Sequence, residues 1–193
     1  TNARANLINN RHLMELPYPE RHYPAKVEGN FGRELPADEN LRLKPGARVM
    51  FVKNGKEWVN GSLGTVVGTD EFSAQVQLDE GGAVVEVNPE VWEKSRYGWD
   101  RLRNQIVTEP IGSFTQLPLK LAWAVTIHKS QGLTFDRIHI DLDRPAFSHG
   151  QVYVALSRCR TLAGLSLTRP VNERDLIVNP HALDFAQRAG LLS

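Results

Sequence analysis

Short β-type runs separated by glycine fill the middle of the 193-residue chain, and this pattern restricts the fold more than any other feature. From Leu41 to about Pro89 four such runs follow one another, at residues 48–52, 64–68, 74–78 and 83–87. The last two lie on either side of Glu80-Gly81-Gly82, a pattern typical of a β-hairpin. Short strands at such close intervals predict a small β-barrel of about 50 residues.

The segments on either side of this barrel have the pattern of an α/β domain. Residues 1–16 carry apolar side chains near helical spacing, and the prolines that follow end the predicted helix. Residues 17–40 are rich in Pro, Glu, Asn and Gly, which predicts a connecting loop. A strand at 137–142, a helix at 149–158 and a strand at 164–168 follow in the order typical of a parallel sheet. We therefore predict an α/β domain formed by residues 1–40 and 114–193, with an inserted module at 41–113.

The end of the inserted module combines aromatic and basic side chains. Trp92, Tyr97 and Trp99 lie close in sequence to Lys94, Arg96, Arg101 and Arg103. Aromatic rings among cations can stack on the bases of single-stranded DNA, with Trp92 and Trp99 as the candidates. Equally, the aromatic side chains could cover the open end of the barrel while the cations are solvated. The sequence leaves both interpretations open.

Composition excludes several classes of site. A single cysteine, Cys159, excludes a disulfide framework and a zinc site built on several thiolates. His128, His139 and His149 lie on different predicted elements without ligand spacing, so no metal site is expected. A net charge of +1 gives little support to a free-standing nucleic-acid binder.

The ends and the hydropathy of the chain suggest its setting. No stretch approaches the roughly 20 apolar residues that cross a bilayer, so no membrane partner is expected. The polar N-terminus has no apolar signal core and no initiating Met, from which we expect an excised segment of a cytoplasmic protein.

Two late segments carry the polar chemistry. The first is TIHKSQG at residues 126–132, and the second is GQVYVALSR at residues 150–158. Thr126, His128, Lys129 and Ser130 supply several hydrogen-bond donors within one short loop, and such donors can hold phosphates without reading bases. Gly132 lets the backbone turn closely there. The alternative is a solvated turn that is merely polar.

These two segments, in this order, resemble motifs V and VI of RecD-like superfamily 1 helicases. The opening Thr1-Asn2-Ala3 matches the same family, and residues 43–50 resemble the start of its inserted SH3-like module. The resemblance covers nearly the whole chain. It implies a RecA-like parallel-sheet domain of the P-loop NTPase type with a small SH3-like β-barrel inserted, in an ATP-dependent enzyme that translocates on single-stranded DNA and unwinds duplex.

The resemblance also implies roles for individual residues. It assigns DNA contacts to Thr1, Asn2, Thr126, His128, Lys129 and Ser130. It places Gln131, Gly132 and Thr134 opposite the nucleotide, which is ATP with Mg.

Arg158 matches the motif VI arginine finger that reaches the γ-phosphate, where a planar guanidinium stabilises the charge of phosphoryl transfer. The commoner arrangement of an arginine is a pair with a nearby carboxylate on a helix surface. Arg160 is a second candidate for the nucleotide, and a surface ion pair explains it equally well.

Two motifs of a complete ATPase are missing from the sequence. No G-x-x-x-x-G-K-[ST] segment occurs, and no apolar strand ends in Asp-Glu. In the family both belong to the first RecA-like domain, so this chain alone is expected to be inactive and to share ATP with that domain. Two rival interpretations are a passive module that binds nucleic acid or protein, and a subunit of an exodeoxyribonuclease V-like complex with other repair or recombination proteins.

Overall fold

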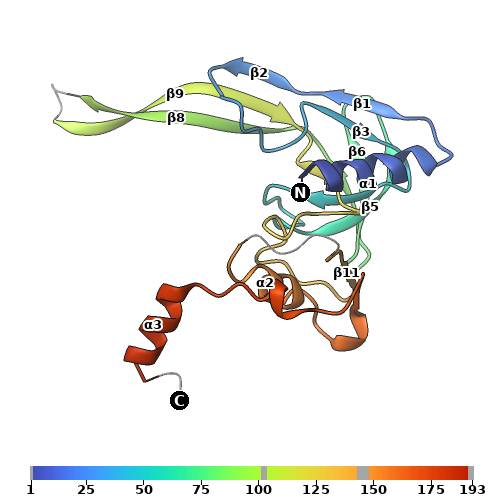
Figure 1. Ribbon diagram of the computed structural model, residues 1–193. Coiled ribbons are helices and arrows are strands. Elements are labelled where there is room, and N and C mark those ends of the chain that lie inside the picture. The colour runs from blue at the N-terminus through green and yellow to red at the C-terminus, as the bar shows by residue number, and fades with distance from the viewer. Residues whose placement is uncertain (1, 101–103, 143–147, 191–193) are drawn as a thin grey trace. The chain divides into compact units, whose positions relative to one another are not determined.

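The computed structural model describes residues 2–100, 104–142 and 148–190 (Figure 1). The chain divides into two compact units, Thr1–Ala124 and Val125–Ser193. None of the described helices is long and apolar enough to cross a membrane. Each unit is built around its own hydrophobic core.

The first unit begins with helix α1, Asn2–Glu15, which confirms the helix predicted over residues 1–16. Its buried face carries Asn9 and the fully buried Leu13. The Asn9 amide donates to the carbonyl oxygens of Leu121 and Ala124, at 3.2 and 2.9 Å. In return, the backbone N–H of Ala124 donates to Asn9 Oδ1 at 2.8 Å. One side chain therefore fastens α1 to the end of the unit.

The four predicted strands are neighbours in one antiparallel sheet. They are β4 (Arg48–Phe51), β5 (Leu63–Thr69), β6 (Ala74–Leu78) and β7 (Val84–Val87). The three-residue strand β10 (Leu119–Leu121) adds to β4, so the order is β10-β4-β5-β6-β7.

The five-stranded sheet is open, and no closed barrel is found among the described residues. Its edge strands β10 and β7 pair with each other nowhere in this part of the chain. They are only three and four residues long, so each offers few backbone groups with which the two edges could pair and close a barrel. The glycine-punctuated pattern located the strands correctly, but strand positions alone do not decide whether two edges meet.

Residues 17–40 contain strands, so the prediction of a plain connecting loop was wrong. Strand β1 (Arg21–Pro24) pairs with β3 (Asn40–Leu43), and β2 (Lys26–Gly29) pairs with the distant β9. Each of these strands has only four residues, and β2 is exposed along its length. Short, exposed strands lack the alternation that sequence patterns detect.

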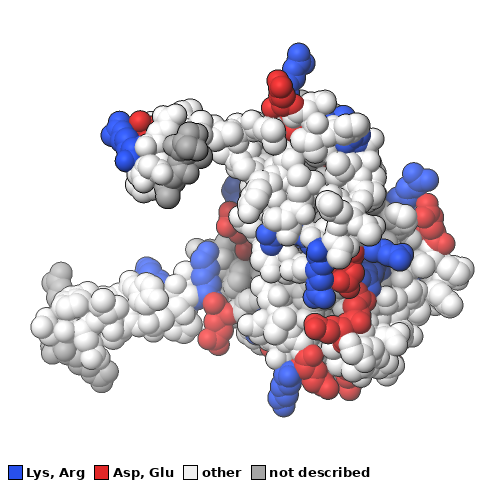
Figure 2. All heavy atoms as spheres, turned by 90° about the horizontal axis from the view of Figure 1, so that it is seen from below, with Lys and Arg blue, Asp and Glu red and all other residues white. Residues whose placement is uncertain are grey.

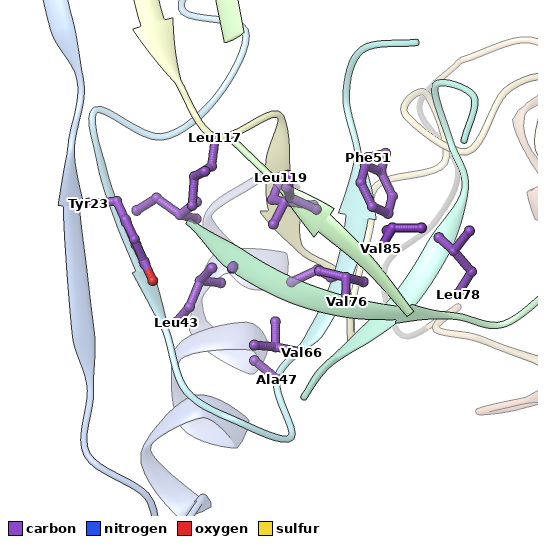
Figure 3. Close-up of a cluster of buried hydrophobic side chains, with 14 of the residues drawn as sticks. Tyr23, Leu43, Ala47, Phe51, Val66, Val76, Leu78, Val85, Leu117 and Leu119 are labelled. Carbon is purple, nitrogen blue, oxygen red and sulfur yellow. The ribbon is translucent and has the colours of Figure 1, made fainter. Parts of the chain in front are cut away.

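The core of the first unit lies between α1 and the strands (Figure 3). Leu13 of α1 belongs to the same cluster of buried side chains as Val49, Val66 and Val76 of the sheet. The helix therefore packs in one core with the strands that the sequence placed in an inserted module. The division into residues 1–40 with 114–193, and 41–113, stays a prediction.

A long ribbon extends from this unit and corresponds to the predicted arm (Figure 1). Strands β8 (Glu90–Asp100) and β9 (Gln105–Gln116) pair antiparallel, with a register shift between Lys94 and Ser95. At the root, the fully buried Phe114 lies 5.7 Å from the ring centroids of both Phe31 and Trp92. Aromatic packing therefore anchors the arm to the unit.

The second unit confirms the predicted strand–helix–strand order. Strand β11 (Ile138–Ile140) pairs in parallel with β12 (Leu165–Leu167), and helix α2 (Gln151–Leu156) lies between them in sequence. Two one-turn 3₁₀ helices, Leu162–Gly164 and Glu173–Asp175, and helix α3 (Pro180–Arg188) complete it. Its core contains Ile140, Leu142, Val152 and Ala155.

Gly164→Ala tests how tightly the second unit is packed. A Cβ at this position would overlap the carbonyl oxygen of Asp136 and lie 3.1 Å from Cys159 Sγ. We expect the free energy of unfolding to fall by about 1–3 kcal/mol, the usual cost of overpacking. Urea unfolding measures it, with Ala163→Ser at the exposed neighbour as the control. Equal midpoints for both variants would contradict this close approach.

Asp175 predicts a pH dependence of stability. Hydrogen bonds from Arg169 and then from the Asn172 backbone N–H lower the pKa of this carboxyl from 3.8 to about 2. Because the charged form is favoured in the folded state, its contribution is present above pH 4 and is lost as the pH falls towards 2. Thermal unfolding of Asp175→Asn and the unmodified protein should therefore differ at pH 6 and converge near pH 2. Asp184→Asn removes an exposed ion pair on α3. Its melting temperature should stay close to that of the unmodified protein at both pH values.

Candidate functional site

Phe135, three residues after the TIHKSQG segment, is hydrogen-bonded to the end of the GQVYVALSR segment and to Arg160 beyond it, within the second unit. The backbone N–H of Phe135 donates to the Arg158 carbonyl at 2.8 Å, and the N–H of Arg160 donates to the Phe135 carbonyl at 3.0 Å. These bonds form an isolated parallel bridge between Phe135 and Cys159. The bridge fixes the residues just after the TIHKSQG segment beside those just after the GQVYVALSR segment.

Residues 126–133 form a compact turn. The backbone N–H of Ser130 donates to the Thr126 carbonyl at 3.0 Å, and that of Leu133 donates to the Ser130 carbonyl at 3.0 Å. Gly132 adopts φ +82°, a left-handed conformation that favours glycine, which confirms the close turn predicted there. The polar side chains of Thr126, His128, Lys129 and Ser130 are therefore held within one short turn.

The polar side chains of the turn divide into an exposed and a buried set. His128, Lys129 and Gln131 are exposed, and Thr126 is half-buried. Ser130 differs, because only 4% of it is exposed and its hydroxyl donates to the Ile127 carbonyl at 2.8 Å. Its side chain therefore holds the turn in shape, and the predicted DNA contact by Ser130 stays a prediction. Exposed donors on such a turn can bind phosphate oxygens.

Arg158 follows α2 and is held by three hydrogen bonds. Its Nε donates to the Val154 carbonyl at 3.0 Å, Nη1 to the Leu133 carbonyl at 3.0 Å, and Nη2 to Ser157 Oγ at 2.9 Å. The Val154 carbonyl is available because the Arg158 backbone N–H donates to Ala155 instead, at 3.2 Å. The end of the helix thus leaves an acceptor for the guanidinium.

The guanidinium keeps two donors for an outside partner. An arginine has five N–H donors, and three of them are used by the described residues, which leaves one on Nη1 and one on Nη2. Arg158 is partly exposed and forms no ion pair with a carboxylate in the described part of the chain. The surface ion pair considered from the sequence is therefore not the arrangement found. Guanidinium N–H donors suit a phosphoryl group.

The other predicted nucleotide residues are exposed. Gln131, Gly132 and Thr134 lie on or beside the turn. Arg160 pairs with Asp136 at 3.5 Å, with 61% and 83% of the two side chains exposed. A pair this exposed contributes little to stability, so the Arg160 side chain is readily released. Its nucleotide contact stays a prediction.

The first unit carries the remaining candidates. Asn2 is exposed in the first turn of α1, and Thr1 lies outside the described residues. Trp92 is half-buried against Phe114, and the Lys53 ammonium lies 5.2 Å from its ring centroid. Its packing therefore supports the structural interpretation for this tryptophan.

Farther along the arm the aromatic side chains are free of such packing. Trp99 is 57% exposed, and Tyr97, two residues earlier on the same strand, is 80% exposed. Ile106, opposite Trp99 in the register, is also exposed. Alternate residues of a strand share a face, so these three form one apolar stripe on the ribbon.

The face shown in Figure 2 carries no broad basic surface among the described residues. On the face shown in Figure 2, Lys and Arg side chains lie interspersed with Asp and Glu, as the net charge of +1 suggests. Within the described residues, no group of three His, Cys, Asp or Glu side chains could hold a metal ion. Any anion binding therefore depends on individual donors, such as those of the turn and of Arg158.

Comparison with known proteins identifies the relatives of this chain. Residues 121–166, which include both polar segments, match the UvrD-like helicase C-terminal domain. The ATP-dependent DNA helicase PIF1 of Xenopus laevis is 34% identical over an alignment of 189 residues, and the match covers 93% of this chain and 28% of that protein.

Solved structures agree. Unliganded Pif1 from Bacteroides sp is 38% identical, with a TM-score of 0.87 over 98% of this chain and 44% of the other. Pif1 helicase from Bacteroides in complex with ADP-AlF3 and ssDNA is 38% identical, with a TM-score of 0.80 over 99% of this chain and 44% of the other.

The chain spans well under half the length of these relatives. They are Pif1 helicases, which corrects the RecD-like resemblance expected from the sequence, and no support remains for an exodeoxyribonuclease V subunit. The fold is that of a helicase C-terminal RecA-like segment with mixed α/β sheets. By these similarities the chain resembles the UvrD-like helicase C-terminal domain over residues 121–166, and part of the Pif1 DNA helicases over nearly its whole length.

Proposed function

We propose that the chain is part of an ATP-dependent DNA helicase that translocates on single-stranded DNA and unwinds duplex. The observation that carries this proposal is the Arg158 guanidinium, held by three hydrogen bonds with two N–H donors left over. It lies in the same unit as the polar turn and is bonded to it through Leu133. Similarity to an ATP-dependent DNA helicase supports the reaction.

In this proposal Arg158 acts as the arginine finger. ATP with Mg supplies the phosphoryl group, and its phosphates and metal are held by a separate nucleotide-binding domain. The two remaining N–H donors of Arg158 stabilise the negative charge that develops on the γ-phosphoryl oxygens. Gln131, Gly132, Thr134 and Arg160 line the same side of the nucleotide. The chain alone is then inactive, because it contributes only one wall of the site.

The DNA strand is bound by donors of the turn. Thr126, His128 and Lys129 contact phosphates, while the Ser130 side chain shapes the loop from within. Asn2 adds a contact from the start of α1, and Trp99 stacks on a base. A similar Pif1 was solved with ssDNA bound, which supports the partner.

Arg158→Ala tests the arginine finger. In the full-length protein, we expect DNA-stimulated ATP hydrolysis to fall about 10³- to 10⁵-fold, because the transition state loses its charge stabilisation. Affinity for oligo-dT should stay within about twofold, since the turn is unchanged. Arg188→Ala, which breaks an exposed pair on α3, serves as the control and should hydrolyse ATP normally. A turnover rate near that of the unmodified protein would remove Arg158 from the reaction.

Trp99→Ala and Trp92→Ala separate the two interpretations of the arm. A stacked base contributes about 1–3 kcal/mol, so Trp99→Ala should weaken binding of oligo-dT about fivefold to a hundredfold with an unchanged melting temperature. Trp92→Ala should instead lower the melting temperature, because it removes packing against Phe114. Fluorescence anisotropy and thermal unfolding give the two readouts. Unchanged affinity for Trp99→Ala would contradict stacking.

The rival function is a passive binding module, which the exposed Tyr97 and Trp99 favour. The same anisotropy assay on this chain alone, over a series of salt concentrations, distinguishes it. Affinity equal to that of the full-length protein would favour the passive module over a motor that shares its DNA site between domains.

A further inference from the structure

The hydroxyl of Ser157 lies between the end of α2 and the Arg158 guanidinium. Ser157 Oγ donates to the Val154 carbonyl at 3.0 Å and accepts from Arg158 Nη2 at 2.9 Å. A serine hydroxyl has a single hydrogen. Because that hydrogen is donated to the Val154 carbonyl, the hydroxyl oxygen accepts from the guanidinium through a lone pair.

The three acceptors of Arg158 come from two segments of the chain. Val154 and Ser157 belong to the end of α2, and Leu133 belongs to the end of the polar turn. Without the hydroxyl, only two carbonyl oxygens would hold the guanidinium, one on each segment. The long arginine side chain has many rotamers, and fixing it in one of them costs conformational entropy.

The hydroxyl also determines which donors stay available. It occupies one N–H of Nη2, as Leu133 occupies one N–H of Nη1, so that the remaining donors are one on each terminal nitrogen. One donor on each terminal nitrogen can serve a bidentate contact with two phosphoryl oxygens. Ser157 is thus a residue that the sequence analysis passed over and that acts on the orientation of its neighbour.

We propose that Ser157 is a positioning residue, whose hydroxyl holds the Arg158 guanidinium in the orientation that phosphoryl transfer requires. The inference rests on the proposed function of Arg158. A purely structural role is the alternative, because a serine near a helix end often bonds to a carbonyl three or four residues earlier. The two roles differ in their effect on turnover and on stability.

The experiment compares three single variants of the full-length protein in DNA-stimulated ATP hydrolysis. A hydrogen bond to a charged group is worth about 1.5–3 kcal/mol, so Ser157→Ala should lower kcat roughly tenfold to a hundredfold. The KM for ATP should change less than about threefold, because the bond acts in the transition state. Ser157→Thr keeps the hydroxyl and should recover most of kcat. Ser166→Ala removes a hydroxyl that bonds to Ile138 and His139 and should leave kcat unchanged.

Stability and a double variant separate positioning from folding. Ser157 is exposed with φ −70° and ψ −2°, which alanine adopts freely, so the melting temperature should not fall. In an Arg158→Ala background, adding Ser157→Ala should produce no further loss, because the hydroxyl acts only through the guanidinium.

Each contrary outcome has its own meaning. Normal kcat in Ser157→Ala, or an equal loss in the Arg158→Ala background, overturns the positioning role alone while Arg158 remains the finger. Full activity of Arg158→Ala overturns the proposed function and the positioning role with it. A loss in Ser157→Ala that Ser157→Thr does not recover, accompanied by a lower melting temperature, assigns the residue to the helix end and overturns positioning.

Discussion

The organisation of the second unit depends on the two backbone hydrogen bonds between Phe135 and residues 158 and 160. They join segments that are more than twenty residues apart and bring the polar turn beside Arg158. The Nη1–Leu133 bond then adds a side-chain link across the same join. These bonds are made by backbone groups, so they fix the alignment of the two segments without help from the exposed side chains. Those side chains can therefore take part in binding rather than in packing.

Much of the fold could be predicted from the sequence, because local patterns of apolar residues, glycine and proline indicate most of its elements. The central strands β4 to β7, helix α1 and the parallel β11–α2–β12 order were correct for that reason. The strands of residues 17–40 were missed because β2 forms a strand only by pairing with β9, some eighty residues later. The five-stranded sheet is open because its two short edge strands do not meet, and no local sequence pattern indicates where those strands end.

The candidate site shows the same division. The close turn at Gly132 was predicted, since it follows from the residue type and its place in a motif. The burial of Ser130, the packing of Trp92 and the contact of Ser157 with Arg158 could not be predicted from residue type. Each depends on which way a side chain points at the end of an element, and hydroxyl and indole groups serve packing and binding equally well.

The fastening of α1 by Asn9 has a consequence for the order in which the chain folds. The amide bonds to carbonyl groups 112 and 115 positions later, beyond strands β4 to β7 and the arm. Contacts this distant in sequence form late, because the intervening loop must close first. During synthesis the Asn9 bonds therefore cannot form until residue 124 has left the ribosome, although the core around Leu13 can begin to assemble before that. Fastening of the first helix is thus one of the last steps in the maturation of this unit.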